Sequence, residues 1–324
     1  MYISRNFDPK TILKFSWKST LCVLALSTTA YYLKRVNASV EIPFLPIGTI
    51  GTAVAFYLGF KNNSSYDRLW EARKIWGEIT NLCRTLASYV IACSPPELPV
   101  EVSDIINRQI LFANVLKAQL RKNMVWENTL YASLSKRKNN RSYEEELTDA
   151  LSACTCSIDR HVFEESANSA TQILHRQMVA IRALKDQGVI NANECSDLMK
   201  MCAELVVQQG NAERIKDFPF PRQYAYFSEL FVYIFVALLP FGLIPEFEKL
   251  NAGTTWLSIP FTVLVGWVFI TMDRIGDTSE NPFENGVYDI PLNAICRQIE
   301  VDLKQMQGKT DLPAPILASN NVLM

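Results

Sequence analysis

The chain has 324 residues, of which 49% are hydrophobic and 20% are charged, and its formal net charge is −1. This composition lies between that of a soluble domain and that of a transporter built almost entirely of spans, so it predicts membrane helices together with a sizeable polar part. A net charge close to zero argues against a dedicated nucleic-acid binder, which needs a basic excess.

Four segments are long and apolar enough to cross a bilayer, whose ~30 Å hydrocarbon core needs about 20 residues of helix. Residues 42–60 and 251–272 contain no charged side chain. Residues 16–33 contain Lys18 near their start, where its long side chain can reach the headgroups. Residues 223–245 contain Glu229, which lies close enough to the edge of this segment to be interpreted as interfacial. The sequence therefore predicts an integral membrane protein with four spans.

Basic residues predict which side of the membrane each connecting segment occupies. They gather before the first span, after the second and before the third, at Arg5, Lys10, Lys14, Lys61, Arg68, Arg73, Lys74, Lys216 and Arg222. The positive-inside rule then places both termini and the large insert in the cytosol. The predicted parts are a cytosolic segment 1–15, two spans in 16–60, a cytosolic helical domain 61–222, two spans in 223–272, a cytosolic helix in 273–306 and an unstructured tail 307–324.

The cytosolic part has helical periodicity throughout, so the fold class is all-α. Amphipathic runs predict helices over 64–93, 102–121, 170–187, 193–215 and 290–306. The prolines of "SPPELP" (94–99) end the first of these runs, because proline lacks an amide donor and clashes with the preceding turn. The stretch "SKRKNNRSYEEE" (135–146) is interpreted as a solvated turn, since its basic and acidic halves cancel.

The stretch "GTAVAFYLGFKNNSSYDRLWEARKIWG" (51–77) carries two stripes of residues spaced four apart. The small stripe allows close approach of a neighbouring helix, and the bulky stripe lies about 100° away on the helix surface. Because no proline follows the apolar half, we expect one helix to continue from the membrane into the cytosolic domain. The bulky stripe could face lipid, another helix or a lumen, where a ring of subunits would form an apolar constriction. The small stripe is Gly51, Ala55 and Gly59, and the bulky stripe is Thr52, Phe56 and Phe60.

The usual signatures of enzymes are missing from the sequence. It has no GxxxxGK[ST] loop, GxGxxG, HExxH or GxSxG motif. His161 and Glu164 share a predicted helical face, but two ligands without a third are a weak metal signal. The sequence therefore predicts a protein that is not an enzyme and that has no cofactor and no metal site.

Three motifs, "GFKNNSSYDRLWEARKIWG" (59–77), "NAERIKDFPFPRQYAYF" (211–227) and "ENPFENGVYDIPLNAICRQIEVDL" (280–303), resemble the bacterial branch of the bestrophin family in their residues and their order. The resemblance implies a homopentameric ion channel with four membrane helices per subunit and a large helical cytosolic domain. It also implies that the second membrane helix lines the pore neck with Thr52, Phe56 and Phe60, and that a cytosolic aperture falls at Ile173. The expected partners are copies of the chain itself, monovalent ions and the lipid bilayer of a bacterial inner membrane.

The resemblance leaves gating and ion selectivity to be considered residue by residue. Animal members of the family bind calcium with an acidic cluster after an "NPF" motif, but here Asn281-Pro282-Phe283 is followed only by Glu284 and Asp289. Calcium takes six to eight oxygen ligands, so the sequence predicts no calcium activation. A neck of Thr and Phe has no fixed charge, and aromatic edges favour anions whereas aromatic faces favour cations. The alternative function is that of a non-conducting, membrane-anchored helical scaffold or sensor.

Overall fold

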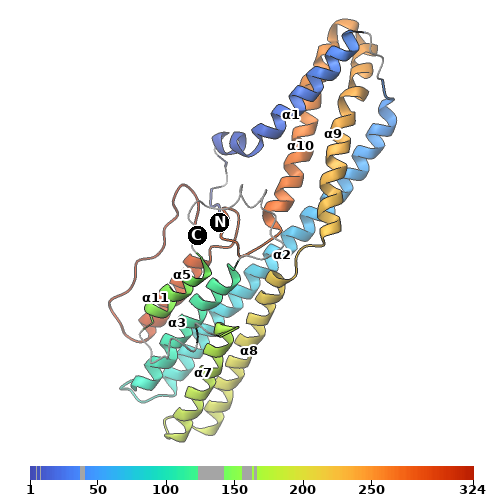
Figure 1. Cartoon of the computed structure of the whole chain (residues 1–324). Coiled ribbons are helices and arrows are strands. Elements are labelled where there is room, and N and C mark those ends of the chain that lie inside the picture. The colour runs from blue at the N-terminus through green and yellow to red at the C-terminus, as the bar shows by residue number, and fades with distance from the viewer. Residues whose placement is uncertain (5, 8, 37–40, 123–141, 155–162, 164–165) are drawn as a thin grey trace. The chain divides into compact units, whose positions relative to one another are not determined.

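The computed structural model describes residues 1–4, 6–7, 9–36, 41–122, 142–154, 163 and 166–324, and this part of the chain is nearly all helical, with isolated β-bridges and no extended strand (Figure 1). The longer helices have lengths typical of helices that cross a membrane or pack in bundles. The elements are α1 (Pro9–Arg35), α2 (Phe44–Ala92), α3 (Val100–Leu120), α5 (Tyr143–Ser152), α7 (Ser169–Asp186), α8 (Ala192–Asp217), α9 (Arg222–Leu250), the short 3₁₀ helix η1 (Ala252–Leu257), α10 (Ser258–Ser279) and α11 (Leu292–Met306).

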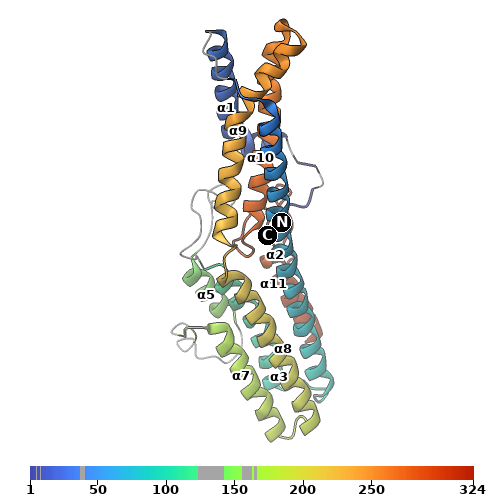
Figure 2. The ribbon, with the colours of Figure 1, turned by 90° about the vertical axis from the view of Figure 1, so that its right-hand side faces the viewer.

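Contacts between residues divide the chain into two compact units. The apolar unit comprises Ser4–Arg68 and Pro219–Asn281, and the helical unit comprises Met1–Ile3, Leu69–Phe218 and Pro282–Met324. Helix α2 begins in the apolar unit and ends in the helical unit as one unbroken helix of 49 residues (Figure 2). The absence of proline after residue 60 predicted this continuity.

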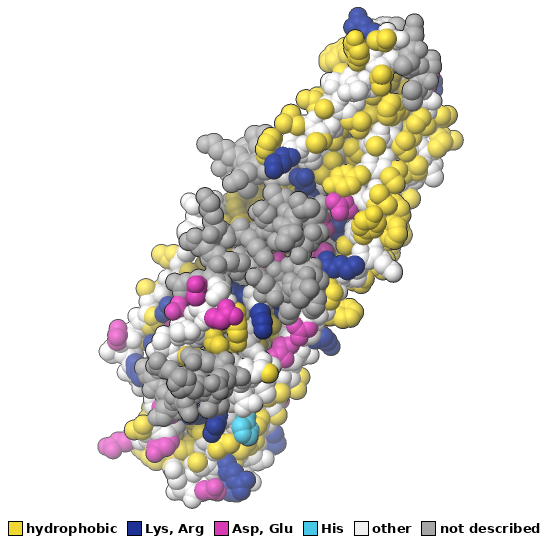
Figure 3. Space-filling model, viewed as in Figure 1, with side chains coloured by type: hydrophobic (Ala, Val, Ile, Leu, Met, Phe, Trp, Pro, Cys, Tyr) yellow, Lys and Arg dark blue, Asp and Glu magenta, His cyan; other side chains and the backbone are white. Residues whose placement is uncertain are grey.

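Three helices in the described part of the chain are long and apolar enough to cross a membrane. They are α2, α9 and the helix formed by η1 and α10, over Phe44–Ala92, Arg222–Leu250 and Gly253–Ser279. Hydrophobic side chains cover the visible face of α9, α10 and the first part of α2, with few charged atoms among them (Figure 3). These helices correspond to three of the four predicted spans. Helix α1 contains the predicted fourth span, 16–33, and its crossing of the membrane stays a prediction.

Helix α1 is less apolar than the other three because it is rich in Ser and Thr. Its hydroxyls donate hydrogen bonds back to carbonyl oxygens of the preceding turn, as Ser16 does to Ile12 O at 2.9 Å and Thr29 does to Ala25 O at 2.7 Å. Such bonds satisfy the hydroxyl donor without water. The helix packs against α10 and α9, with Val23 and Ala30 buried.

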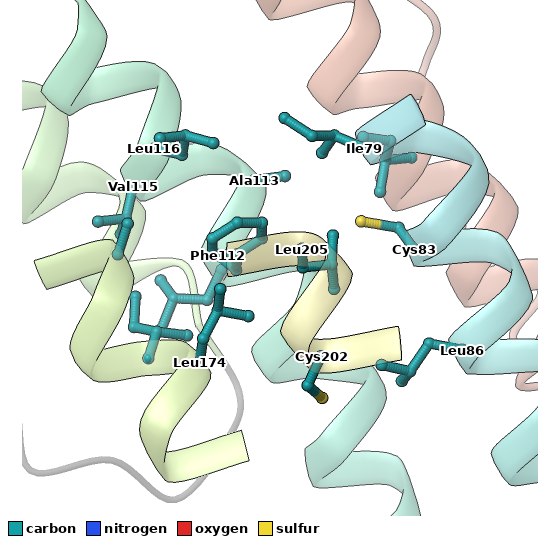
Figure 4. Packing of buried hydrophobic residues seen from close by; sticks show 14 of the residues in the cluster. Ile79, Cys83, Leu86, Phe112, Ala113, Val115, Leu116, Leu174, Cys202 and Leu205 are labelled. Carbon is teal, nitrogen blue, oxygen red and sulfur yellow. The ribbon is translucent and has the colours of Figure 1, made fainter. Parts of the chain in front are cut away.

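The core of the helical unit is built from the later part of α2 together with α3, α7, α8 and α11. Figure 4 shows Phe112 of α3 between side chains of neighbouring helices, among them Leu174 of α7 and Leu205 of α8. All three side chains are buried, as the helical periodicity of these segments requires. Burial of apolar surface from water therefore holds this unit together.

One prediction about the polar segments was wrong. Glu144, Glu145 and Glu146 do not form a turn but the first turn of α5, where Ser142 Oγ accepts a hydrogen bond from Glu145 N at 3.2 Å and completes a capping box. The basic half of that stretch, 135–141, lies outside the described residues. The tail 307–324 contains no helix after α11, and Ile3 N donates to Asn321 O at 2.9 Å. Its lack of structure stays a prediction.

Candidate functional site

One face of α2 in the apolar unit packs against the chain's own helices. Val54 and Leu58 on this face are buried among apolar side chains of α9 and α10. Gly51 lies on the same face, and a Cβ built there would stand 2.6 Å from a ring carbon of Phe235 in α9. That separation is shorter than any normal carbon contact, so a side chain at this position would force the Phe235 ring to move, and glycine lets the ring pack directly on α2.

The residues of the small stripe of α2 therefore do not all have the same surroundings. Gly51 packs against α9, but Ala55 and Gly59 are exposed on the single chain. A Cβ built at Gly59 would meet no atom within 4 Å. Packing of Ala55 and Gly59 against a neighbouring subunit stays a prediction.

The bulky stripe lies on the outward side of the same helix. The side chains of Phe56 and Phe60 are 69% and 58% exposed, and their ring centroids stand 4.8 Å apart with the planes at 88°. This edge-to-face arrangement joins the two rings into one continuous apolar surface. Thr52 extends the line, and its hydroxyl donates to Gly48 O at 3.0 Å. The stripe thus presents aromatic rings and a hydroxyl whose donor is already engaged within the helix.

A buried cluster of charges follows the stripe along α2, and we call it the lysine cluster. The Lys61 ammonium stands 2.7 Å from a carboxylate oxygen of Asp273 and 2.6 Å from one of Asp277, both on α10. The side chains are 1%, 5% and 11% exposed, respectively. Ser228 of α9 donates a hydrogen bond to the same oxygen of Asp273 that the Lys61 ammonium contacts, at 3.0 Å. The cluster ties three helices of the apolar unit together.

Two further contacts extend this charged region toward the end of α10. Arg68 Nε donates to the backbone oxygen of Glu280 at 3.0 Å, and Arg222 stands 3.5 Å from the Glu280 carboxylate. Glu280 is almost fully buried, and that burial, aided by the negative charge of Asp277, raises its pKa to about 7 despite the arginines.

Sequence reasoning missed the lysine cluster, although a signal for it exists. The uncharged segments 42–60 and 251–272 are followed at once by Lys61 and Asp273, two charges of opposite sign. If both spans end at the same membrane face, these charges lie at the same depth and can pair.

The role of Ile173 at a cytosolic aperture stays a prediction, and the structure shows where this side chain lies in the single chain. Ile173 is fully buried in the core of the helical unit, on the α7 face that also carries Leu174 and Ile181. A side chain that lines a passage between subunits must be exposed on its own subunit. Ile173 is therefore a core residue in this structure.

The segment after α10 is held by backbone contacts of a buried carboxylate. Asp289 accepts hydrogen bonds from Phe283 N at 3.0 Å, Asn285 N at 2.9 Å and Ile290 N at 2.6 Å. Burial raises the pKa of Asp289, and these backbone donors oppose the rise. Arg121 donates to the side-chain oxygen of Asn285 at 3.0 Å. The Asp289 carboxylate and the side-chain oxygen of Asn285 are thus already engaged by groups of the chain itself.

No group of three or more His, Cys, Asp or Glu side chains that could hold a metal ion occurs among the described residues. The pair of His161 and Glu164 considered from the sequence lies outside those residues.

Comparison with known proteins links this arrangement to one family. The family model of the bacterial and fungal bestrophin proteins matches residues 9–305. The voltage-dependent anion channel-forming protein YneE of Escherichia coli O157:H7 is 30% identical over 286 residues, which cover 87% of this chain and 82% of that protein. A similarly named protein of Mesorhizobium japonicum is 28% identical, over 82% of this chain and 75% of its own length. A crystal structure of a variant of a bacterial bestrophin homologue from Klebsiella pneumoniae has a TM-score of 0.73 and 25% identity, and covers 93% of this chain and 100% of that one.

Proposed function

Because the chain belongs to the family of bacterial and fungal bestrophins, we propose that it is the subunit of a membrane channel for small monovalent ions. The family match extends over residues 9–305, so it includes both units. Related chains carry the name of voltage-dependent anion channel-forming proteins. The apolar helices of this chain supply the membrane part that such a function needs.

The bulky stripe of α2 is the observation that carries this proposal. Thr52, Phe56 and Phe60 are exposed on the single chain, whereas the opposite face of α2 is buried against its own helices. In a ring of subunits, we place this stripe at the neck of the pore. A narrow apolar constriction restricts ions by excluding water, and small movements of its side chains change the flux.

We propose a homopentamer with four membrane helices per subunit, of which α1 is the fourth. The back-bonded hydroxyls of α1 support this, because their donors need no water within the bilayer. Both termini and the helical unit would lie in the cytosol, and the membrane would be the bacterial inner membrane. Ala55 and Gly59 would face the neighbouring subunit.

We propose chloride or another small monovalent ion as the permeant species. The names of the relatives favour anions, while the neck residues carry no fixed charge that would select a sign. Calcium activation is not part of the proposal, since the Asp289 carboxylate is engaged by three backbone amides. An aperture in the cytosolic part is not assigned, because Ile173 is buried.

The deciding experiment is a measurement of currents and reversal potential in planar bilayers under a NaCl gradient. Phe60→Ala should increase the current, because it widens the apolar constriction. Phe261→Ala serves as the matched control, since Phe261 is 48% exposed on α10 and lies outside the stripe. The sign of the reversal potential distinguishes anions from cations. If wild type and Phe60→Ala both form intact oligomers and neither conducts, the scaffold function takes the place of the channel.

A further inference from the structure

The lysine cluster joins α2 to α10 at the residue that directly follows the bulky stripe. Lys61 continues the buried face of α2, one turn after Leu58, and Phe60 precedes it on the exposed side. Successive residues of a helix point about 100° apart, so the directions of Lys61 and Phe60 are coupled. Any rotation of α2 at this level that moves Phe60 must also move the Lys61 ammonium.

Two independent features fix Lys61 against α10. The first is its pair of ion contacts, at 2.7 and 2.6 Å, with Asp273 and Asp277. These carboxylates are one helical turn apart on the same face of α10, where they would repel each other without a cation between them. The second is Gly276, at which a Cβ would stand 3.2 Å from Lys61 Cε and 2.6 Å from Asn62 Oδ1. Glycine therefore leaves the space in which the lysine side chain lies.

The same face of α2 is held again two turns later. Arg68 follows Lys61 by seven residues and binds the backbone of Glu280, which follows Asp273 by seven residues. A seven-residue step is about two helical turns, so the two contacts lie on one line along both helices. Two contacts spaced along the helices resist rotation of α2 relative to α10 better than one contact would.

We propose that Lys61 is a positioning residue for the neck: its ion pairs with Asp273 and Asp277 fix the rotation of α2 and so hold Phe60 in the constriction. The proposal rests on the channel function proposed above. Removal of the lysine charge breaks both ion pairs, so α2 is no longer held against α10 and can rotate. The current then rises because Phe60 leaves its position in the neck.

The test is a double-mutant comparison of planar-bilayer currents at equal amounts of reconstituted oligomer. Lys61→Met is expected to increase the wild-type current several-fold, and Lys61→Arg, which keeps the charge, is expected to leave it near the wild-type level. In the Phe60→Ala background, Lys61→Met should produce no further increase, since it acts through Phe60. Lys249→Met, which removes an exposed charge of the same unit, is the control and should not change the current.

An equal effect of Lys61→Met in both backgrounds, or no effect in either, would overturn the proposal. If Lys61→Met fails to assemble, the triple variant Lys61→Met, Asp273→Asn, Asp277→Asn replaces it, because it leaves no unpaired buried charge. The triple variant should increase the wild-type current as Lys61→Met does, and it should give no increase in the Phe60→Ala background. A triple variant that leaves the wild-type current unchanged would count against the proposal. If neither wild type nor Phe60→Ala conducts, the channel function itself fails, which is a different outcome.

Discussion

The apolar unit and the helical unit use the same secondary structure but are held together in different ways. In the helical unit, large side chains such as Trp76 and Phe112 are fully buried, whereas in the apolar unit Leu45 is 81% exposed and Phe56 is 69% exposed. The contacts that fix the apolar unit include the close approach at Gly51 and the lysine cluster. Helices in lipid gain nothing from hiding apolar surface, so close packing and buried polar contacts take over. The predictions below test this difference.

The largest effect is expected from removal of a core side chain in the helical unit. Phe112→Ala should lower the free energy of unfolding by ~3–5 kcal/mol, because it leaves a cavity in a packed core. Thermal unfolding in detergent, followed by circular dichroism, measures the loss. Phe218→Ala is the control, since Phe218 is 66% exposed in the same unit. Equal losses for the two variants would show that burial does not distinguish these positions.

The next effect concerns the dependence of the apolar unit on pH. Burial raises the pKa of Glu280 to about 7 in the folded chain, from an ordinary value of 4.5. Between pH 4.5 and pH 7 the folded protein keeps a proton on Glu280 that the unfolded chain has already lost. The contribution of Glu280 to the free energy of unfolding is therefore complete below pH 4.5 and is lost as the pH rises to about 7. The loss of stability that Glu280 can cause over this pH range is at most about 3 kcal/mol. Glu280→Gln should flatten the pH dependence of the unfolding temperature and exceed wild type in stability at pH 8.

Glu246→Gln is the matched control for this experiment, because Glu246 is an exposed partner of Lys249. It should retain the wild-type slope between pH 5 and pH 8. A wild-type protein whose stability rises over this range would contradict the role assigned to Glu280.

A smaller effect separates the two glycines of the small stripe. Gly51→Val should destabilise the subunit by ~1–3 kcal/mol, because the added carbons overlap Phe235. Gly59→Val should leave the stability of the subunit unchanged, since no atom outside its own stretch of helix lies within 4 Å of the new Cβ. Size-exclusion chromatography with light scattering then shows whether Gly59→Val weakens the oligomer, as packing against a neighbour requires. An intact oligomer would place Gly59 outside the interface.

The smallest effect is expected at a helix start in the helical unit. Ser142→Ala removes the acceptor for Glu145 N and should cost ~1 kcal/mol. Asn191→Ala provides a matched comparison, because Asn191 caps α8 with the same type of box. Both changes should lower the unfolding temperature slightly, and an unchanged value for Ser142→Ala would indicate that α5 does not depend on its cap.

Local periodicity predicted most of the helices and placed the bulky stripe on one side of α2. The run from 51 to 92 has no proline and keeps its helical spacing, so the continuity of α2 was readable from the sequence. Phe56 and Phe60 were expected on one side, and both are exposed. These predictions rest on neighbours along the chain, which are the contacts that a sequence pattern records.

Contacts between distant residues were not readable in the same way. Lys61 and Asp273 are 212 positions apart, and nothing in either segment alone shows that they pair. The packing of Ile173 was not readable for a related reason, because the family resemblance gave a position but not the packing of α7. The polar residues Gln172, His175 and Arg176 on the other face of α7 were the available sign that Ile173 faces the core.

The packing of α1 has a consequence for the order in which the protein is made. Helix α1 packs against α10 and α9, and both follow it by more than 180 residues along the chain. A ribosome therefore completes α1 long before either partner exists. During that interval the back-bonded hydroxyls keep the helix compatible with lipid on its own. With α1 as the proposed fourth membrane helix, we expect nascent chains halted before α10 to hold it loosely in the membrane and to expose it to degradation.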